Sequence, residues 1–224
     1  MYEEHPKIPV AIDCVIFGYE ADELKLLLYP RRFEPNKGDW SLMGGFVQEQ
    51  ESMEETVKRV LKQTVGLENI FVEQVGAYSN PNRDPGGRVI SMAYYALIRI
   101  GEHDRELVDD KGGKWWSIMD RPHLIFDHSQ MVADALSRLQ SKATYRLIGR
   151  ELLPRHFTLT QLNNLYNAIF QRQFNAGNFR KKLATLNELE KLKIKDTESS
   201  KRGAFLYKFK QTKKQLEHDR IVRL

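Results

Sequence analysis

The sequence predicts an α+β protein with two domains, which we place at residues 1–145 and 146–224. In the first part, apolar runs rich in β-branched and aromatic residues alternate with one or two amphipathic helices. In the second part, two short helices precede a pair of strands joined by a basic, glycine-containing turn. The charge also divides, because residues 145–224 hold 18 Lys and Arg against 7 Asp and Glu (+11) and the remainder holds 17 against 23 (−6). This segregation predicts an acidic body and a basic unit that faces a polyanion, for which nucleic acid is our interpretation.

The predicted strands of the first domain are short apolar runs separated by turn-forming residues. They cover Val10–Phe17, Leu24–Leu28, Trp40–Val47, Ile70–Tyr78, Val89–Ile98 and Lys114–Ile118. Gly18–Asp22 is expected to form the first turn, and Asn80–Gly87 has the composition of a loop. Helical periodicity marks Ser129–Gln140.

A further helix is predicted from Ser52 to Val65. Ser52 and Glu55 have the spacing of a capping box, which satisfies backbone amides at a helix start. Gly66 fits the left-handed residue that ends a helix.

This helix and the residues before it carry the spacing of the Nudix box, a hydrolase signature written G-x5-E-x7-R-E-U-x-E-E-x-G-U with U aliphatic. The residues on pattern are Gly45, Glu51, Arg59, Leu61, Gly66 and Leu67, but Val60, Gln63 and Thr64 replace the three helix glutamates. Those three positions are spaced to share one helix face, where glutamates would hold Mg²⁺ over a pyrophosphate. Valine, glutamine and threonine supply no anionic oxygen, so we predict no catalytic residue, no metal site and no cofactor. A weak ion at the nearby acids Glu49, Glu51, Glu54 and Glu55 is the alternative.

The second domain has the pattern of a winged helix-turn-helix. After a linker at Gly149–Pro154, Thr158 or Thr160 is expected to cap a helix with apolar residues at helical spacing. A break at Phe174–Asn178 precedes a second helix at Phe179–Leu186. The wing is the hairpin formed by Leu189–Ile194 and Ala204–Phe209 around Ser199–Gly203.

The predicted DNA contacts are polar and basic residues at the starts of the two helices and at the wing tip. They are Thr160, Gln161, Asn178, Arg180, Lys181, Lys201 and Arg202. Phe179, Leu183 and Leu186 are expected to point into the core instead. The alternative is a basic surface that docks on an acidic protein.

Together these motifs resemble the NrtR-type Nudix-related transcriptional regulators, in which a catalytically degenerate Nudix domain precedes a winged helix-turn-helix. The resemblance rests on Gly44–Leu67, Asn82–Tyr94, Ile125–His128, Phe157–Leu162, Asn178–Lys182 and Lys201–Phe209. It implies an α/β/α Nudix sandwich followed by the winged helix, and a repressor rather than an enzyme. It also implies a homodimer on palindromic double-stranded operator DNA, released by a small-molecule effector.

Residues 33–47 are most similar to the AraR-like branch of these regulators, which responds to L-arabinose. Loss of the helix glutamates also favours a neutral sugar as effector. The predicted ligand-binding residues are Arg32, Glu34 and Trp40 before the box, and Tyr78, Arg83 and Arg88 around the long loop. Two alternatives stay open: an ADP-ribose-sensing regulator of NAD metabolism, and an active ADP-ribose pyrophosphatase.

The expected cellular compartment follows from the single cysteine and from the missing membrane and secretion signals in this sequence. Its one cysteine, Cys14, lies in an apolar run and is expected to be a buried strand thiol, so no internal disulfide can form. No apolar stretch reaches the length of a transmembrane helix, and the N-terminus has no signal pattern. We therefore expect a cytoplasmic protein with no membrane partner.

Overall fold

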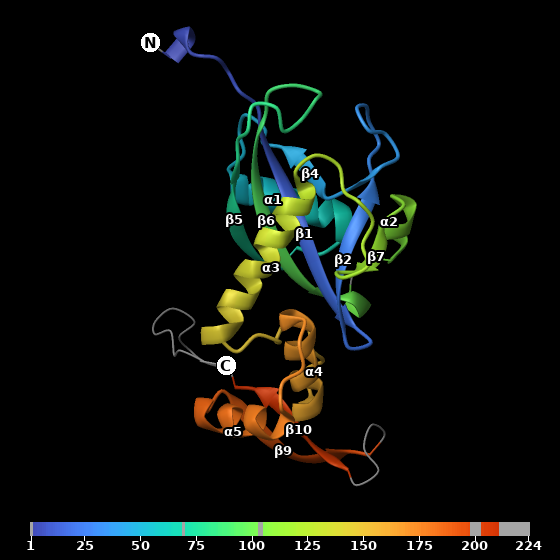
Figure 1. Ribbon diagram of the computed structural model, residues 1–224, viewed down its shortest axis with the longest axis vertical. Helices are drawn as coiled ribbons and strands as arrows, with labels where there is room; N and C mark the ends of the chain where they lie inside the picture. Colours follow the sequence, from blue (N-terminus) through green and yellow to red (C-terminus); the bar gives the residue numbers. More distant parts are fainter. Residues whose placement is uncertain (1, 69, 103–104, 198–202, 211–224) are drawn as a thin grey trace. The chain divides into compact units, whose positions relative to one another are not determined.

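The computed structural model describes residues 2–68, 70–102, 105–197 and 203–210 (Figure 1). The chain divides into two compact units, one formed by Met1–Gly18 with Lys25–Ala135 and the other by Tyr19–Leu24 with Leu136–Leu224. Each unit combines helices with strands, which confirms the α+β class. Among the described residues, every helix is too short or too polar to cross a lipid bilayer.

The first unit is built on a sheet whose seven described strands have the order β3-β2-β1-β6-β5, with β4 paired to β1 and β7 paired to β2. The strands are β1 (Val10–Glu20), β2 (Glu23–Pro30), β3 (Trp40–Ser41), β4 (Met43–Phe46), β5 (Phe71–Tyr78), β6 (Ile90–Arg99) and β7 (Lys114–Ser117). Antiparallel pairing places Ala11 opposite Phe46 and Cys14 opposite Met43. Cys14 is buried, as predicted, and burial raises the pKa of its thiol.

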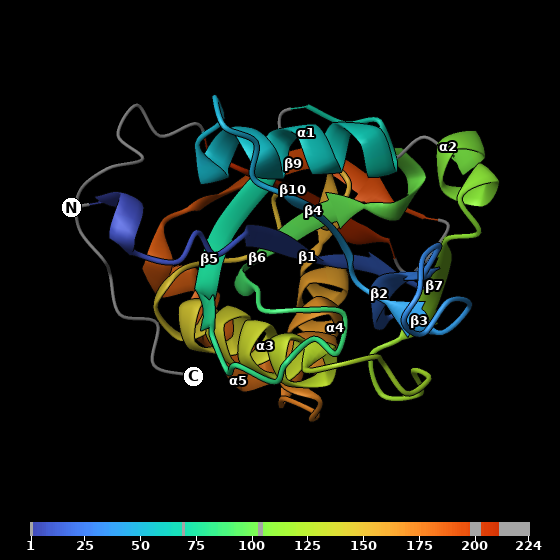
Figure 2. The ribbon, with the colours of Figure 1, turned by 90° about the horizontal axis from the view of Figure 1, so that it is seen from above.

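Helices cover both faces of this sheet, with α1 (Met53–Val65) on one side and, on the other, the start of α3 (His128–Tyr145), of which His128–Ala135 belongs to the first unit (Figure 2). The remaining helix is α2 (Arg105–Asp110), and two 3-10 turns occupy Tyr2–Glu4 and Ile100–Glu102. The layered arrangement agrees with the expected α/β/α sandwich.

The ends of α1 lie where the sequence predicted them. The Ser52 side chain accepts from the Glu55 amide while the Glu55 carboxylate accepts from the Ser52 amide, which completes the capping box. Gly66 ends the helix in the left-handed region with φ 72°. The inner stripe of α1, including Val57, Val60 and Leu61, packs into an apolar core cluster together with side chains of the sheet.

The clearest differences from the sequence prediction concern the ends of two elements and one short helix. Strand β1 continues through Glu20, so the turn is only Ala21–Asp22, with φ 51° and 61°, the primed turn that matches strand twist. Helix α3 runs five residues past the predicted end at Gln140, because buried Ala143 continues its apolar stripe. The short α2 was missed, since six residues are too few to show a helical period.

Besides Tyr19–Leu24 and the end of α3, the described part of the second unit contains a three-stranded sheet of order β8-β10-β9 and two further helices. Its elements are β8 (Phe157–Thr158), α4 (Leu159–Phe170), α5 (Ala176–Leu186), β9 (Leu189–Asp196) and β10 (Ala204–Phe209). Thr158, and not Thr160, is the N-cap of α4, and Gln161 completes its capping box. Asn175 caps α5, so this helix starts three residues before the predicted Phe179, and Asn178 lies inside it. Helix, turn, helix and two-stranded wing follow one another as predicted.

Candidate effector pocket and nucleic-acid interface

A cavity of about 450 Å³ opens in the first unit where β4 lies against β1. Its walls come from these two strands, from the residues after β2 and from the segment around Phe126 and His128. Gly44 is required in this wall, because a Cβ there would lie 2.3 Å from the Ile12 carbonyl oxygen and 2.7 Å from an Asp13 carboxylate oxygen. The pocket therefore depends on one of the glycines in the Nudix-like segment.

The helix positions that carry glutamates in the Nudix box lie in different environments here. Val60 is buried in the apolar cluster, and Thr64 is buried with its hydroxyl donating to the Val60 carbonyl at 2.5 Å. Gln63 is exposed. The expectation that all three share one helix face is thus only partly right, because two of them are turned into the core.

Glu51, the glutamate that this chain retains from the Nudix box pattern, is already hydrogen-bonded within the protein. Its two carboxylate oxygens accept hydrogen bonds from Arg59 at 2.6 and 2.7 Å, and Thr56 donates a third at 3.0 Å. Hydrogen bonding from Arg59 lowers the pKa of Glu51 to about 2. Within the described ranges, no three His, Cys, Asp or Glu side chains are grouped so that they could hold a metal ion.

Three of the six predicted ligand residues line the pocket: Arg32, Glu34 and Arg83. Arg83 is largely occupied, since it is only 8% exposed and forms a bidentate ion pair with Asp127 at 2.6 and 2.8 Å. It also lies 3.5 Å from Asp13. The Arg83 guanidinium thus holds the pocket floor together.

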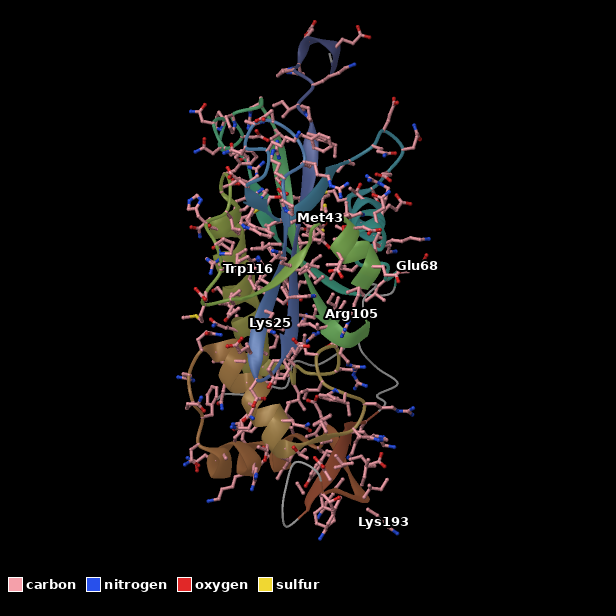
Figure 3. All side chains as sticks on the ribbon, turned by 90° about the vertical axis from the view of Figure 1, so that its right-hand side faces the viewer. Lys25, Met43, Glu68, Arg105, Trp116 and Lys193 are labelled. Atoms are coloured by element: carbon pink, nitrogen blue, oxygen red, sulfur yellow. The ribbon has the colours of Figure 1, made fainter. Side chains whose placement is uncertain are left out.

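The other three predicted ligand residues do not line this pocket, and each has a structural partner. Trp40 packs edge-on against Trp116 of β7, with ring centroids 5.3 Å apart; Figure 3 shows Trp116 near Lys25 of the neighbouring β2. The Tyr78 hydroxyl donates to Asp134 at 2.6 Å. Arg88 donates to the carbonyls of Ser79 and Val89.

Buried polar residues that were not predicted as site residues form hydrogen bonds in and behind the pocket wall. Ser91 donates to Asp13 at 2.6 Å, and the Leu42 amide donates to Nδ1 of His128 at 3.1 Å. Burial lowers the pKa of His128, which fits a neutral ring that accepts at Nδ1. The signal was available for Asp13, because a carboxylate within an apolar strand requires a partner.

The wall near α2 carries cations without carboxylate partners. Arg32 donates to the Asp110 carbonyl at 3.3 Å, and the Lys111 ammonium donates to the Gln63 carbonyl. Both side chains line the pocket, and within the described chain neither forms an ion pair. Lys111 was not predicted, because its sequence context gives no sign that it reaches the pocket.

In the second unit, α5 has one buried face and one polar face. Phe179, Leu183 and Leu186 are buried as predicted, whereas Lys181 and Asn178 are exposed. This division leaves the polar and basic side chains of the helix available to a partner.

Two of the predicted contacts at the start of α4 already have partners within the unit. Arg180 is exposed and donates to the Thr160 hydroxyl at 3.3 Å, which joins two predicted DNA contacts. Gln161 uses its side-chain oxygen in the capping box. Lys201 and Arg202 lie outside the described residues.

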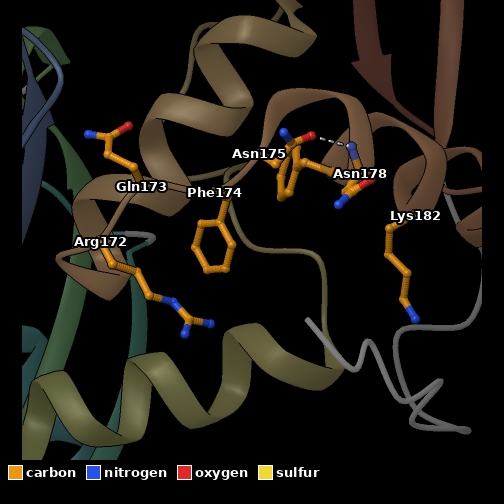
Figure 4. A pocket seen from close by; sticks show the side chains of 7 residues that line it. Arg172, Gln173, Phe174, Asn175, Asn178 and Lys182 are labelled. Carbon is orange, nitrogen blue, oxygen red and sulfur yellow. Dashed lines mark hydrogen bonds between the residues drawn. The ribbon is translucent and has the colours of Figure 1, made fainter.

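A second cavity of about 410 Å³ lies beside the start of α5 (Figure 4). Among the described residues, its lining consists of Arg172, Lys182 and uncharged side chains, without a carboxylate. In the wing, Lys191 and Lys195 lie 3.6 and 4.9 Å from the centre of the exposed Phe205 ring. These cations extend the predicted basic surface, which sequence reasoning confined to the helix starts and the wing tip.

Known proteins share both halves of this architecture. Residues 7–134 match the NUDIX domain family, and residues 149–209 match the NrtR DNA-binding winged helix domain. The chain is 30% identical over 214 residues to the ADPR responsive transcriptional repressor NtrR of Acinetobacter baylyi, covering 92% of this chain and 84% of that protein. The chain belongs to the NrtR family of Nudix-domain transcriptional regulators. Membership confirms a DNA-binding regulator with a Nudix domain.

Solved structures of a family member agree with this fold. Shewanella oneidensis NrtR complexed with a 27mer DNA has a TM-score of 0.81 and 32% identity, over 90% of this chain and 93% of that chain. The NUDIX domain of the same protein complexed with ADP ribose has a TM-score of 0.50 and 30% identity, over 61% of this chain and 92% of that one. The chain is also 38% identical over 130 residues to an ADP-ribose pyrophosphatase of Methanocaldococcus jannaschii, an alignment that covers 58% of this chain and 73% of that enzyme.

Proposed function

We propose that the protein is a repressor that binds operator DNA through α5 and the wing, and that ADP-ribose in the Nudix pocket changes its DNA affinity. The observation that carries this proposal is the similarity, over 92% of the chain, to a repressor named for its response to ADP-ribose. The basic face of α5 and the cationic wall of the pocket suit two anionic partners, DNA and a diphosphate. Binding to a palindrome as a homodimer belongs to the same proposal.

ADP-ribose replaces L-arabinose as the proposed effector. None of the relatives named above is described as responding to arabinose, and a neutral pentose would leave Arg32 and Lys111 without an anionic partner. Exposed aromatic rings at Phe33 and Phe46 also line the pocket and offer stacking surfaces to a nucleobase. The expectation of a neutral sugar rested on the likeness of residues 33–47 to the AraR-like branch and on the lost glutamates, and it did not consider the cations that line the pocket.

A second candidate function is hydrolysis of ADP-ribose, favoured by the similarity to the Methanocaldococcus jannaschii pyrophosphatase. The geometry argues against it, because Val60 and Thr64 are buried and Glu51 is held by Arg59. We expect no release of AMP when the protein is incubated with ADP-ribose and Mg²⁺ and the products are separated by chromatography. Turnover at the rate of a true Nudix hydrolase would favour the enzyme instead.

Fluorescence anisotropy with labelled DNA from upstream of the protein's own gene and its neighbours tests the regulator. We expect tight binding to one such fragment that weakens as ADP-ribose is added and does not respond to L-arabinose. A response to arabinose alone would reverse the choice of effector. Absence of specific binding to every fragment would contradict a DNA-binding regulator with local targets.

A further inference from the structure

Two cations line the pocket wall near α2: Lys111, which contacts one of the helix positions where a Nudix hydrolase carries its metal ligands, and Arg32, whose charge acts on Lys111. Lys111 donates to the backbone carbonyl of Gln63, which is one of the three positions that have lost a glutamate. The carbonyl lies in the last turn of α1, where a positive charge also suits the helix dipole. A protein cation therefore stands close to the place where carboxylates would have gathered divalent cations.

The two cations are held in place without being neutralised. Each is tethered through a main-chain carbonyl, from Asp110 for Arg32 and from Gln63 for Lys111, so further N–H donors stay available. Burial and the nearby Arg32 charge both lower the pKa of Lys111. Two like charges that approach one another on a pocket wall are stabilised by an anion placed between them.

The other cations that line the pocket are not available to bind an anion in this way. Arg83 is paired with Asp127 and Asp13, and Arg31 is stacked on Phe126 at 4.9 Å while it donates to backbone carbonyls. Of the cations that line the pocket, Arg32 and Lys111 are thus the pair that has neither a carboxylate nor a ring partner within the described residues.

We propose that Arg32 and Lys111 form a metal-free phosphate clamp that holds the diphosphate of a nucleoside diphosphate sugar. The inference rests on the proposed function and deepens it by naming how the ligand is recognised. In a hydrolase, divalent cations neutralise the negative charge of the diphosphate. Here the Arg32 guanidinium and the Lys111 ammonium neutralise it instead. Arginine suits two phosphate oxygens at once, and lysine adds a mobile point charge. Loss of the glutamates follows from the same logic, because carboxylates beside Lys111 would neutralise it.

The test is calorimetric titration of the full-length protein with ADP-ribose, once in EDTA and once in Mg²⁺. The phosphate clamp predicts Kd values that agree within roughly twofold in the two buffers, since its cations belong to the protein. Arg32→Gln and Lys111→Gln should each weaken binding by roughly tenfold or more, in both buffers alike. Lys37→Gln is the matched control, because Lys37 is exposed on the same segment, does not line the pocket and should bind as the wild type does.

The outcomes separate the clamp from the function on which it rests. Binding that disappears in EDTA and returns with Mg²⁺ overturns the phosphate clamp and leaves an ADP-ribose-responsive regulator standing. Unchanged affinity in Arg32→Gln and Lys111→Gln, with Kd equal to that of Lys37→Gln, overturns it as well. If the wild type fails to bind ADP-ribose in both buffers, the phosphate clamp and the proposed ADP-ribose response are both overturned. The midpoint of thermal unfolding shows that each variant is folded, and Arg32 is exposed, so its replacement leaves the core intact.

Discussion

At the scale of single residues, burial decides whether a polar side chain of the pocket contacts a ligand or holds the protein structure. Arg83 was predicted as a ligand contact, but its ion pairs with Asp127 and Asp13 make it part of the floor. Removing one partner of such a buried pair leaves an uncompensated charge, which is far more damaging than losing a surface pair. His128 is also buried at the pocket, and it makes the stability of the first unit depend on pH.

We predict that acid destabilises the first unit through His128. Burial lowers the pKa of this side chain in the folded state, so the unfolded chain binds more protons below its own pKa of about 6.5. The free energy of unfolding should fall as the pH drops through 6.5 toward the lowered pKa, by at most about 1.4 kcal/mol per pH unit. Urea titrations of the wild type and of His128→Asn between pH 7.5 and about 5 measure it. An equally steep loss in His128→Asn would assign the effect to other groups.

At the scale of elements, local signals settled the helix ends correctly wherever a capping residue was unambiguous. Ser52, Glu55 and Gly66 mark α1 as predicted. For α4 two threonines competed, and the structure selects Thr158, which is buried, over the exposed Thr160. The two threonines therefore have separable roles.

Thr158→Ala should lower the free energy of unfolding by about 1 kcal/mol, because it removes the side-chain acceptor of the Gln161 amide. Thr160→Ala is the matched control and should change stability by less than about 0.5 kcal/mol. Denaturant titration separates the two variants. Equal destabilisation by both would mean that the Thr158 cap is not the decisive contact.

From the exposed basic face of α5 we predict how the DNA affinity depends on salt concentration. Lys181→Gln should weaken DNA binding and reduce the slope of log affinity against log salt by about one, as expected for the loss of one phosphate contact. Lys58→Gln, an exposed lysine of α1 in the other unit, controls for net charge and should leave the slope unchanged. Anisotropy titrations over a range of KCl concentrations measure both slopes. A slope for Lys181→Gln equal to that of the wild type would place Lys181 outside the phosphate contacts.

For the whole molecule, the charge division along the chain accompanies a division into two compact units, for which we propose anionic partners of different size. If two copies bind one palindrome, half-sites should be separated by one helical turn of DNA, about 34–36 Å, or a multiple of it. Sedimentation should then report twice the chain mass of 26.2 kDa, and footprinting should show two symmetric protected segments. A monomer that protects a single asymmetric segment would contradict the dimeric arrangement.

The sequence alone determined the degenerate Nudix box, the basic winged helix and most of the succession of elements, but not the short α2 or the two-residue β8. These depend on local spacing: capping residues, apolar periodicity and charge are all written within a few neighbouring positions. The order of strands in the sheet and the residues of the pocket were decided only by the tertiary structure. Lys111, Asp13 and His128 meet at one cavity from distant parts of the chain, and long-range packing leaves no periodic mark at any of them. For the same reason Trp40, Tyr78 and Arg88 were misassigned to the pocket, because side chains close to a motif in sequence can turn toward other partners once the sheet is formed.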